Sequence, residues 1–164
     1  CVDQPSDHKY FLTMFDDTSC ACGACHAHGD HFVADRQRFG CGNAVHACRK
    51  GKCVKAAVTD YGPACFIEED AGGAVLDASP AVCHTLTGAS SCGWSDHFSI
   101  TVSRAHLPEV DGRPYGTPFN VTDGELASLI EVGRQIEEQE KRVASGEMVP
   151  PSANANLEPS ARIS

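Results

Sequence analysis

The chain has 164 residues and a formal net charge of −9 with histidines neutral. This length is enough for one domain with a real apolar core. The acidic balance argues against a nucleic-acid partner, because neutralising phosphates requires clustered lysine and arginine. No apolar run is long enough to span a bilayer, so we expect no membrane partner.

The cysteines indicate the cellular compartment in which the protein functions. Ten in so short a chain are typical of a disulfide scaffold, and an even number is consistent with complete pairing. Disulfides persist in oxidising compartments, and residues 120–122 (Asn-Val-Thr) form an acceptor for N-glycosylation. We therefore expect a secreted, extracellular protein, and we interpret the start at Cys1 as the result of processing or trimming.

Short apolar runs with β-branched residues or alternating polarity predict strands. In chain order these runs are residues 10–15, 44–48, 53–59, 74–76 and 97–103. Residues 18–32, rich in Cys, Gly and His, predict a disulfide-held loop, and the basic residues 49–52 predict a solvated hairpin turn. An acidic loop with glycines is expected before residue 74, and a short helix from Ser79 to Leu86.

The composition changes after Arg104. Residues 107–119 read as a loop punctuated by Pro and Gly, after which Thr122 and Glu125 form a capping box that begins an amphipathic helix. The predicted organisation is a core over residues 1–106, a loop and helix packed on it over 107–148, and a flexible tail over 149–164.

Two carboxylates stand where predicted strands give way to loops, a usual place for catalytic groups. Asp60 ends the strand before Tyr61-Gly62-Pro63, and Asp77 ends the next one before a Ser-Pro pair. The alternative is structural, because Asp is common at strand ends, where it caps turns and helices.

The blocks at residues 58–63 (V-T-D-Y-G-P) and 76–81 (L-D-A-S-P-A) resemble the double-psi β-barrel superfamily. That superfamily includes family 45 endoglucanases, expansins and barwin-like proteins, and the resemblance covers about residues 10–104. It implies an all-β fold, a six-stranded double-psi β-barrel with disulfide-rich loops and a C-terminal α-helix.

The resemblance also implies roles for single residues. It makes Asp77 the general acid, and Asp70, seven positions earlier, a helper carboxylate. Residues 13–17 (T-M-F-D-D) are similar to the T-x-Y-x-D signature that carries the general base, which makes Asp17 the base and leaves the adjacent Asp16 as an alternative.

Further residues are expected to contact the substrate. Asp60 supports the acid, Tyr61 matches a sugar-contacting position of expansins, and Trp94 is the single tryptophan of the chain. Few aromatic side chains are available to stack on flat glucose rings, which disfavours crystalline cellulose.

The loop over residues 18–32 offers a competing interpretation. Cys20, Cys22 and Cys25 precede His26, His28 and His31, and such thiols and imidazoles are zinc ligands. In a secreted chain the thiols are expected to be oxidised, so we favour a disulfide-laced loop that faces the substrate. We expect no metal and no cofactor.

The chain is similar in outline to a fungal muramidase group, glycoside hydrolase family 184, whose catalytic domain can follow a cell-wall-binding domain. This resemblance implies hydrolysis of β-1,4 bonds in bacterial peptidoglycan, with the cell-wall polysaccharide as the partner. We expect a monomer, with a detached cell-wall-binding domain as an option. A β-1,4-endoglucanase and a non-catalytic expansin- or barwin-like binding protein remain as alternatives; expansins lack the base, so Asp17 discriminates between them.

Overall fold

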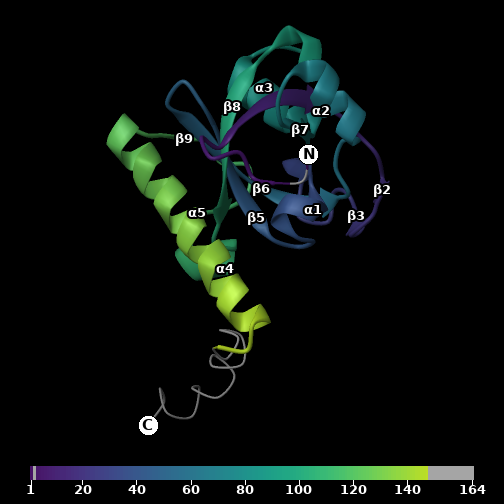
Figure 1. Cartoon of the computed structure of the whole chain (residues 1–164). Coiled ribbons are helices and arrows are strands. Elements are labelled where there is room, and N and C mark those ends of the chain that lie inside the picture. Colours follow the sequence, from purple (N-terminus) through teal and green to yellow (C-terminus); the bar gives the residue numbers. More distant parts are fainter. Residues whose placement is uncertain (2, 148–164) are drawn as a thin grey trace.

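In the computed structural model, six strands close into a barrel (Figure 1). The structure describes residue 1 and residues 3–147. Around the barrel the strands follow the order β4-β7-β1-β8-β5-β6, and β6 pairs with β4 to close it. Two pairings, β1–β7 and β4–β6, are parallel, and the other four are antiparallel. The barrel strands are β1 (Lys9–Met14), β4 (Phe32–Ala34), β5 (Ala44–Arg49), β6 (Lys52–Asp60), β7 (Val75–Ala78) and β8 (Ser99–Ala105).

Shorter elements decorate the barrel. The hairpin of β2 and β3 stands apart from the main sheet, and β9 adds to the edge of β6. The helices lie in the connections and at the C-terminal side. Their bounds are α1 (Arg36–Phe39), α2 (Cys65–Ala71), α3 (Pro80–Thr87), the 3-10 helix η1 (Trp94–Asp96), α4 (Pro108–Asp111) and α5 (Asp123–Ala144); the short strands are β2 (Ser19–Cys20), β3 (Gly23–Ala24) and β9 (Phe119–Asn120). The predicted six-stranded barrel with disulfide-rich loops and a C-terminal helix is confirmed.

The interior of the barrel is filled by alternate residues of its strands, because successive side chains of a strand point to opposite faces. Leu12, Val58 and Leu76 belong to this core and are fully buried. The residues between them point outward, and one of these outward positions is Asp77. Asp77 is therefore carried by a strand whose neighbouring residues, Leu76 and Ala78, are fully buried in the core.

Two connections differ from the prediction. The acidic stretch before β7 was expected to be a loop, but Cys65–Ala71 form α2, which ends where Gly72 adopts a left-handed backbone. A disulfide from Cys1 to Cys65 fixes the start of this helix, which has no side-chain cap. The predicted loop over residues 107–119 contains the short helix α4, and the strand β4 was not predicted because its three residues are too few to show a period.

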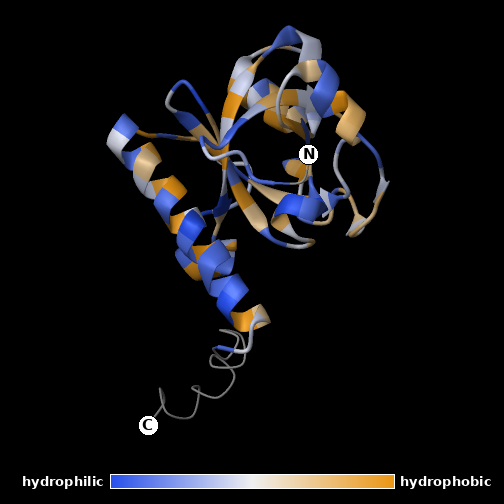
Figure 2. Cartoon of the chain, in the orientation of Figure 1, coloured by the Kyte–Doolittle hydropathy of each residue, from blue (hydrophilic) through white to orange (hydrophobic). Residues whose placement is uncertain are grey.

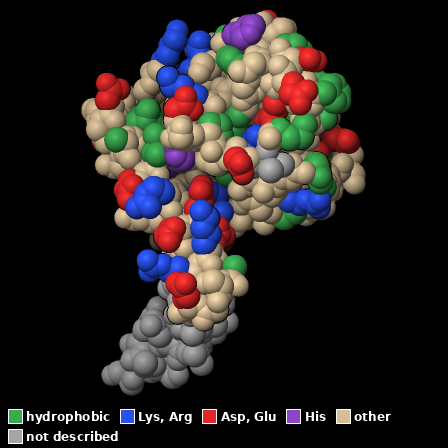
Figure 3. All heavy atoms as spheres, viewed as in Figure 1, with side chains coloured by type: hydrophobic (Ala, Val, Ile, Leu, Met, Phe, Trp, Pro, Cys, Tyr) green, Lys and Arg blue, Asp and Glu red, His purple; other side chains and the backbone are tan. Residues whose placement is uncertain are grey.

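Helix α5 packs on β8 along one side of the barrel (Figure 1). The predicted capping box is present, with Thr122 and Glu125 each accepting from the other's backbone N–H. A Cβ atom on Gly133 would lie 2.7 Å from the carbonyl oxygen of Arg104, so only glycine lets the helix approach this closely. In Figure 2 the helix alternates between hydrophobic and strongly hydrophilic stretches, and in Figure 3 acidic and basic side chains are interspersed along it.

All ten cysteines are paired, as predicted. The five disulfides are Cys1–Cys65, Cys20–Cys25, Cys22–Cys41, Cys48–Cys53 and Cys83–Cys92. Two of them hold the loop over residues 18–32, as expected for that loop. Within the described residues, no helix combines the length and apolar character needed to cross a membrane. The predicted tail over residues 149–164 lies outside the described part.

Candidate active site

The candidate acid, Asp77, lies on β7 between two residues that point into the core. Leu76 and Ala78 belong to the apolar interior, so Asp77 is directed to the outer face of the barrel. The parallel register pairs Asp77 with Thr13 of β1. Its side chain is nevertheless mostly withdrawn from water, and burial in a poorly polarisable surrounding disfavours the charged form.

Asp60 lies close to Asp77 because both strands that carry these residues flank β4. Ala34 of β4 pairs with Asp60 of β6, and on the other side Val33 pairs with Ala78 of β7. The antiparallel pairing with β7 therefore sets Ala34 beside Asp77. Burial, and secondarily the negative charge of Asp60, raise the pKa of Asp77 from its usual 3.8 to about 6. A carboxyl group with this pKa keeps its proton in mildly acidic solution and is suited to act as a general acid.

Asp60 is itself held in place from two directions. Its carboxylate accepts a hydrogen bond from the backbone N–H of Ala21 (2.8 Å), in the disulfide-held loop. Its carbonyl oxygen accepts from the backbone N–H of Asp35 (3.0 Å), just after β4. The charge that raises the pKa of Asp77 is thus held in place by two backbone hydrogen bonds.

The two candidate bases follow the end of β1. The N–H of Phe15 donates to the carbonyl oxygen of Ala78 (2.9 Å), which extends the β1–β7 pairing to the start of the segment that holds Asp16 and Asp17. Asp17 is exposed, and its carboxylate accepts only the adjacent N–H of Thr18 (2.7 Å) among the described residues. Both carboxylates therefore leave the barrel beside the strand that carries Asp77.

Asp16 differs from Asp17 in having a side-chain partner. Its carboxylate lies 2.9 Å from Nε2 of His26, whose Nδ1 lies 3.0 Å from Asp30. These two carboxylates raise the pKa of His26, with the Asp16 hydrogen bond as the larger cause. Asp16 is therefore engaged by an imidazole, whereas Asp17 has no side-chain partner among the described residues.

The histidine loop does not assemble a metal site from the described residues. The three cysteine thiols of the loop are oxidised in disulfides, and the three histidines have separate partners. His26 lies between two aspartates, His28 packs against Tyr115, and His31 lies 3.0 Å from the hydroxyl of Thr85. The loop is instead a folded support whose backbone contacts Asp60.

The remaining predicted contact residues occupy different surroundings. Tyr61 follows Asp60 and is 46% exposed, which leaves its ring available to a ligand. Trp94 is half-buried in η1, which contacts β1. Asp70 is exposed on α2, and the charge that raises the pKa of Asp77 comes from Asp60.

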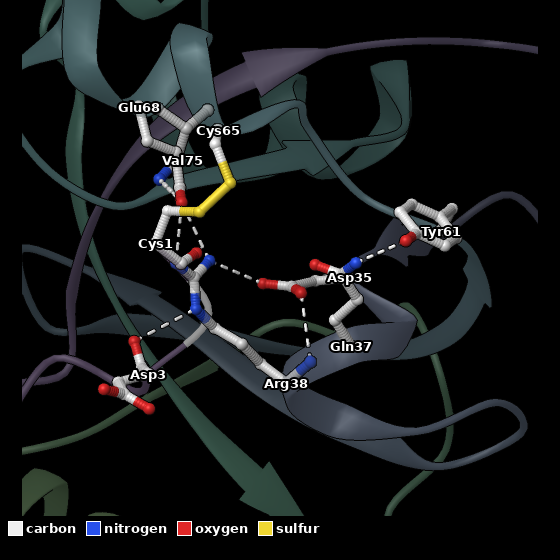
Figure 4. Close-up of a disulfide and its surroundings, with 9 residues drawn as sticks. All are labelled: Cys1, Asp3, Asp35, Gln37, Arg38, Tyr61, Cys65, Glu68 and Val75. Carbon is white, nitrogen blue, oxygen red and sulfur yellow. Dashed lines mark hydrogen bonds and ion pairs between the residues drawn. A yellow bond between two sulfur atoms is a disulfide. The ribbon is translucent and has the colours of Figure 1, made fainter.

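Sequence reasoning missed a buried ion network that joins α1 to α2 (Figure 4). Arg38 donates to both oxygens of Glu68 (2.8 and 2.9 Å) and to Asp35 (2.9 Å). The guanidinium also donates to the carbonyl oxygens of Cys1 (2.7 Å) and Asp3 (3.2 Å). The one available signal was Asp35, a carboxylate directly after the apolar residues of β4.

Comparison with known proteins places this architecture in a family. The family model described as AlyA, Lysozyme A, matches residues 1–142. Lysozyme A of Dictyostelium discoideum is 50% identical over 131 residues, which is 79% of this chain and 71% of that protein. Lysozyme C of the same organism is 52% identical over 132 residues, with the same two shares. No solved structure matches the chain. These relatives come from a slime mould, whereas the sequence had suggested a fungal group. The chain belongs to the Lysozyme A family.

Proposed function

We propose that Asp77 is the general acid and Asp17 the general base of a lysozyme that hydrolyses β-1,4 bonds in peptidoglycan. Membership of the Lysozyme A family makes the chain a glycoside hydrolase. The observation that supports the acid assignment is the placement of Asp77 on a rigid strand, where burial and Asp60 raise its pKa to about 6. Glycoside hydrolysis requires one carboxyl group that delivers a proton and a second that acts as a carboxylate.

The proposed reaction divides the proton transfers between the two aspartates. The carboxyl group of Asp77 donates its proton to the glycosidic oxygen as the bond to the anomeric carbon breaks. The carboxylate of Asp17 removes a proton from the water molecule that attacks the same carbon. The fixed negative charge of Asp60 favours the protonated form of Asp77, so that the proton is present when the glycosidic bond breaks.

The assignment of the base predicts unequal effects of two neighbouring substitutions. Asp17→Asn should lower kcat by about 10²–10⁴-fold, because an amide cannot take the proton from water. Asp16→Asn should lower it by much less, because Asp16 is engaged by His26. Initial rates of wall hydrolysis by the two folded variants measure this difference. A severe loss in Asp16→Asn with a normal rate in Asp17→Asn would move the base by one position.

The substrate is tested by comparing two polymers. We expect the protein to release new reducing ends from purified bacterial walls and few from carboxymethyl-cellulose, because the chain has only one tryptophan and three tyrosines, and Tyr10 is buried in the core and cannot stack on a glucose ring. Preferential release from carboxymethyl-cellulose would favour an endoglucanase. Binding to either polymer without release by the wild-type protein would favour an expansin-like activity.

We also propose that the protein is secreted and acts as a monomer outside the cell. The five disulfides support an oxidising compartment. The predicted glycosylation acceptor Asn120 is exposed on β9, where a glycan would extend into solvent. Because the relatives are lysozymes, the proposed partner is the polysaccharide of the bacterial wall.

A further inference from the structure

An exposed arginine stacks on the tyrosine that follows Asp60. The guanidinium carbon of Arg36 lies 4.7 Å from the centroid of the Tyr61 ring. The hydroxyl of the same tyrosine accepts a hydrogen bond from the side-chain amide of Gln37 (Figure 4). Consecutive residues of α1 thus contact Tyr61 at its ring face and at its hydroxyl, although the residue as a whole is 46% exposed.

The pair sits beside the candidate acid because of the strand order. Arg36 comes two residues after Ala34, which pairs with Asp60 and is next to Asp77 across β4–β7. Tyr61 directly follows Asp60, whose charge raises the pKa of Asp77. Arg36 thus follows the end of β4, which lies between the strands that carry the two aspartates, and Tyr61 follows the end of β6, which carries Asp60.

The frame under this pair is rigid. Asp35 caps α1 by accepting the N–H of Arg38 (3.1 Å), and the buried Arg38 ties the helix to α2 through Glu68. On the other side, a Cβ atom on Gly62 would lie 3.1 Å from the Cα of Asp35, so the turn after Tyr61 packs directly on the start of α1. Side chains held by such a frame lose little freedom on binding a ligand.

The guanidinium of Arg36 has no carboxylate partner among the described residues, in contrast to those of Arg38 and Arg104. A guanidinium that stacks by its face keeps its N–H edge free, and that edge matches a carboxylate in a two-point contact. In a chain of net charge −9, such a group beside the site offsets the repulsion of an anionic substrate.

We propose that Arg36 and Tyr61 form a subsite that recognises a carboxylate of the glycan, with Tyr61 contacting the sugar and Arg36 the acid group. The inference rests on the proposed function and adds a residue that selects peptidoglycan over neutral β-1,4 glycans. The carboxylate belongs either to the lactyl ether of the sugar or to the stem peptide attached to it, and these two sources are separated by experiment.

The test measures kcat/KM for Arg36→Gln on three substrates. These are intact walls, peptide-free glycan strands with free lactyl carboxylates, and the same strands after reduction of their carboxyl groups. We expect the preference for a carboxylate-bearing substrate over the reduced strands to fall about tenfold, mainly through KM, because a charge-assisted contact contributes to binding throughout the reaction. A drop on peptide-free strands identifies the lactyl group, and a drop on intact walls alone identifies the stem peptide.

Arg49→Gln is the matched control, because Arg49 also stacks on an aromatic ring, that of Phe98 at 5.2 Å, but on the β5–β6 hairpin. This variant changes the net charge equally and should keep the wild-type preference. An equal loss in both arginine variants, or an unchanged preference in Arg36→Gln, overturns the inference. Wild-type protein that cleaves none of the three substrates would instead refute the proposed function. In that case binding still tests the subsite. Calorimetry measures the affinities for the acidic and the reduced strands in an Asp77→Asn background, with Arg36 either present or replaced by Gln.

Discussion

Asp77→Asn is expected to lower kcat on bacterial walls by about 10²–10⁴-fold, because an amide delivers no proton to the leaving oxygen. The same change is expected to make the protein more stable at neutral pH. The folded state raises the pKa of Asp77 from 3.8 to about 6. Above pH 6 the ionisation of this carboxyl therefore lowers the free energy of unfolding of the wild type. The variant has no carboxyl at this position and avoids this loss.

The direction of the pKa shift determines the pH range over which the stabilities of the two proteins differ. A group whose pKa is raised on folding stabilises the native state at low pH and loses this contribution as the pH rises through the folded pKa. Because one pKa unit corresponds to about 1.4 kcal/mol, the gain in Asp77→Asn should widen between about pH 4 and 6 and reach at most about 3 kcal/mol. Urea unfolding of both proteins from pH 3.5 to 7.5 measures this gain. An inactive variant that is also less stable than the wild type at pH 7 would show that Asp77 serves the fold instead.

Arg38→Met is expected to cause the largest loss of stability, about 3–5 kcal/mol, because it leaves two buried carboxylates without their cation. The side chains of Arg38, Asp35 and Glu68 are 4%, 3% and 7% exposed. Burial already raises the pKa of Asp35 despite the neighbouring guanidinium, so its carboxylate is especially unfavourable alone. For a domain of this size the loss lowers the melting temperature by on the order of 10 °C.

Arg134→Met is the matched control for this substitution. Arg134 pairs with Glu131 on α5, but both side chains are more than half exposed, at 60% and 51%. Exposed pairs contribute about 0–1 kcal/mol, so this variant should unfold close to the wild type. Calorimetric melting of the three proteins in the same buffer compares the two sites. Similar small losses in both variants would mean that the network behind Asp60 and Tyr61 is not what holds α1 and α2 together.

The parts of the structure that depend on local chemistry could be predicted from the sequence. The β-branched run that ends at Asp60 forms a strand with that end, and the short run predicted to end at Asp77 forms β7, which continues one residue further to Ala78. Thr122 and Glu125 cap a helix because their side chains satisfy donors only three residues away. In each case the residues that decide the structure lie within one turn or one strand of each other.

The parts of the structure that depend on pairing between residues far apart in the chain could not be predicted from the sequence. Asp60 and Asp77 are brought together only by β4, a strand of three residues that joins β6 and β7 through a parallel and an antiparallel pairing. The partners of Arg38 lie up to 37 positions away, in segments that carry no common motif. Gly133 lies within α5, where the absence of a side chain lets the helix contact the backbone of β8. Such contacts follow from the closed barrel and have no signature in a local window.

The pH dependence of kcat/KM, measured for the wild type and for Asp60→Asn, shows whether Asp77 acts as the general acid. The wild-type rate should fall as the pH rises through about 6, because Asp77 loses the proton that it must donate. In Asp60→Asn the amide oxygen still accepts the N–H of Ala21, but the charge that helps to raise the pKa of Asp77 is gone. We expect the alkaline limb to lie at lower pH in this variant. An alkaline limb that stays in place, or wild-type activity that persists to pH 9, would contradict the assignment of Asp77 as the general acid.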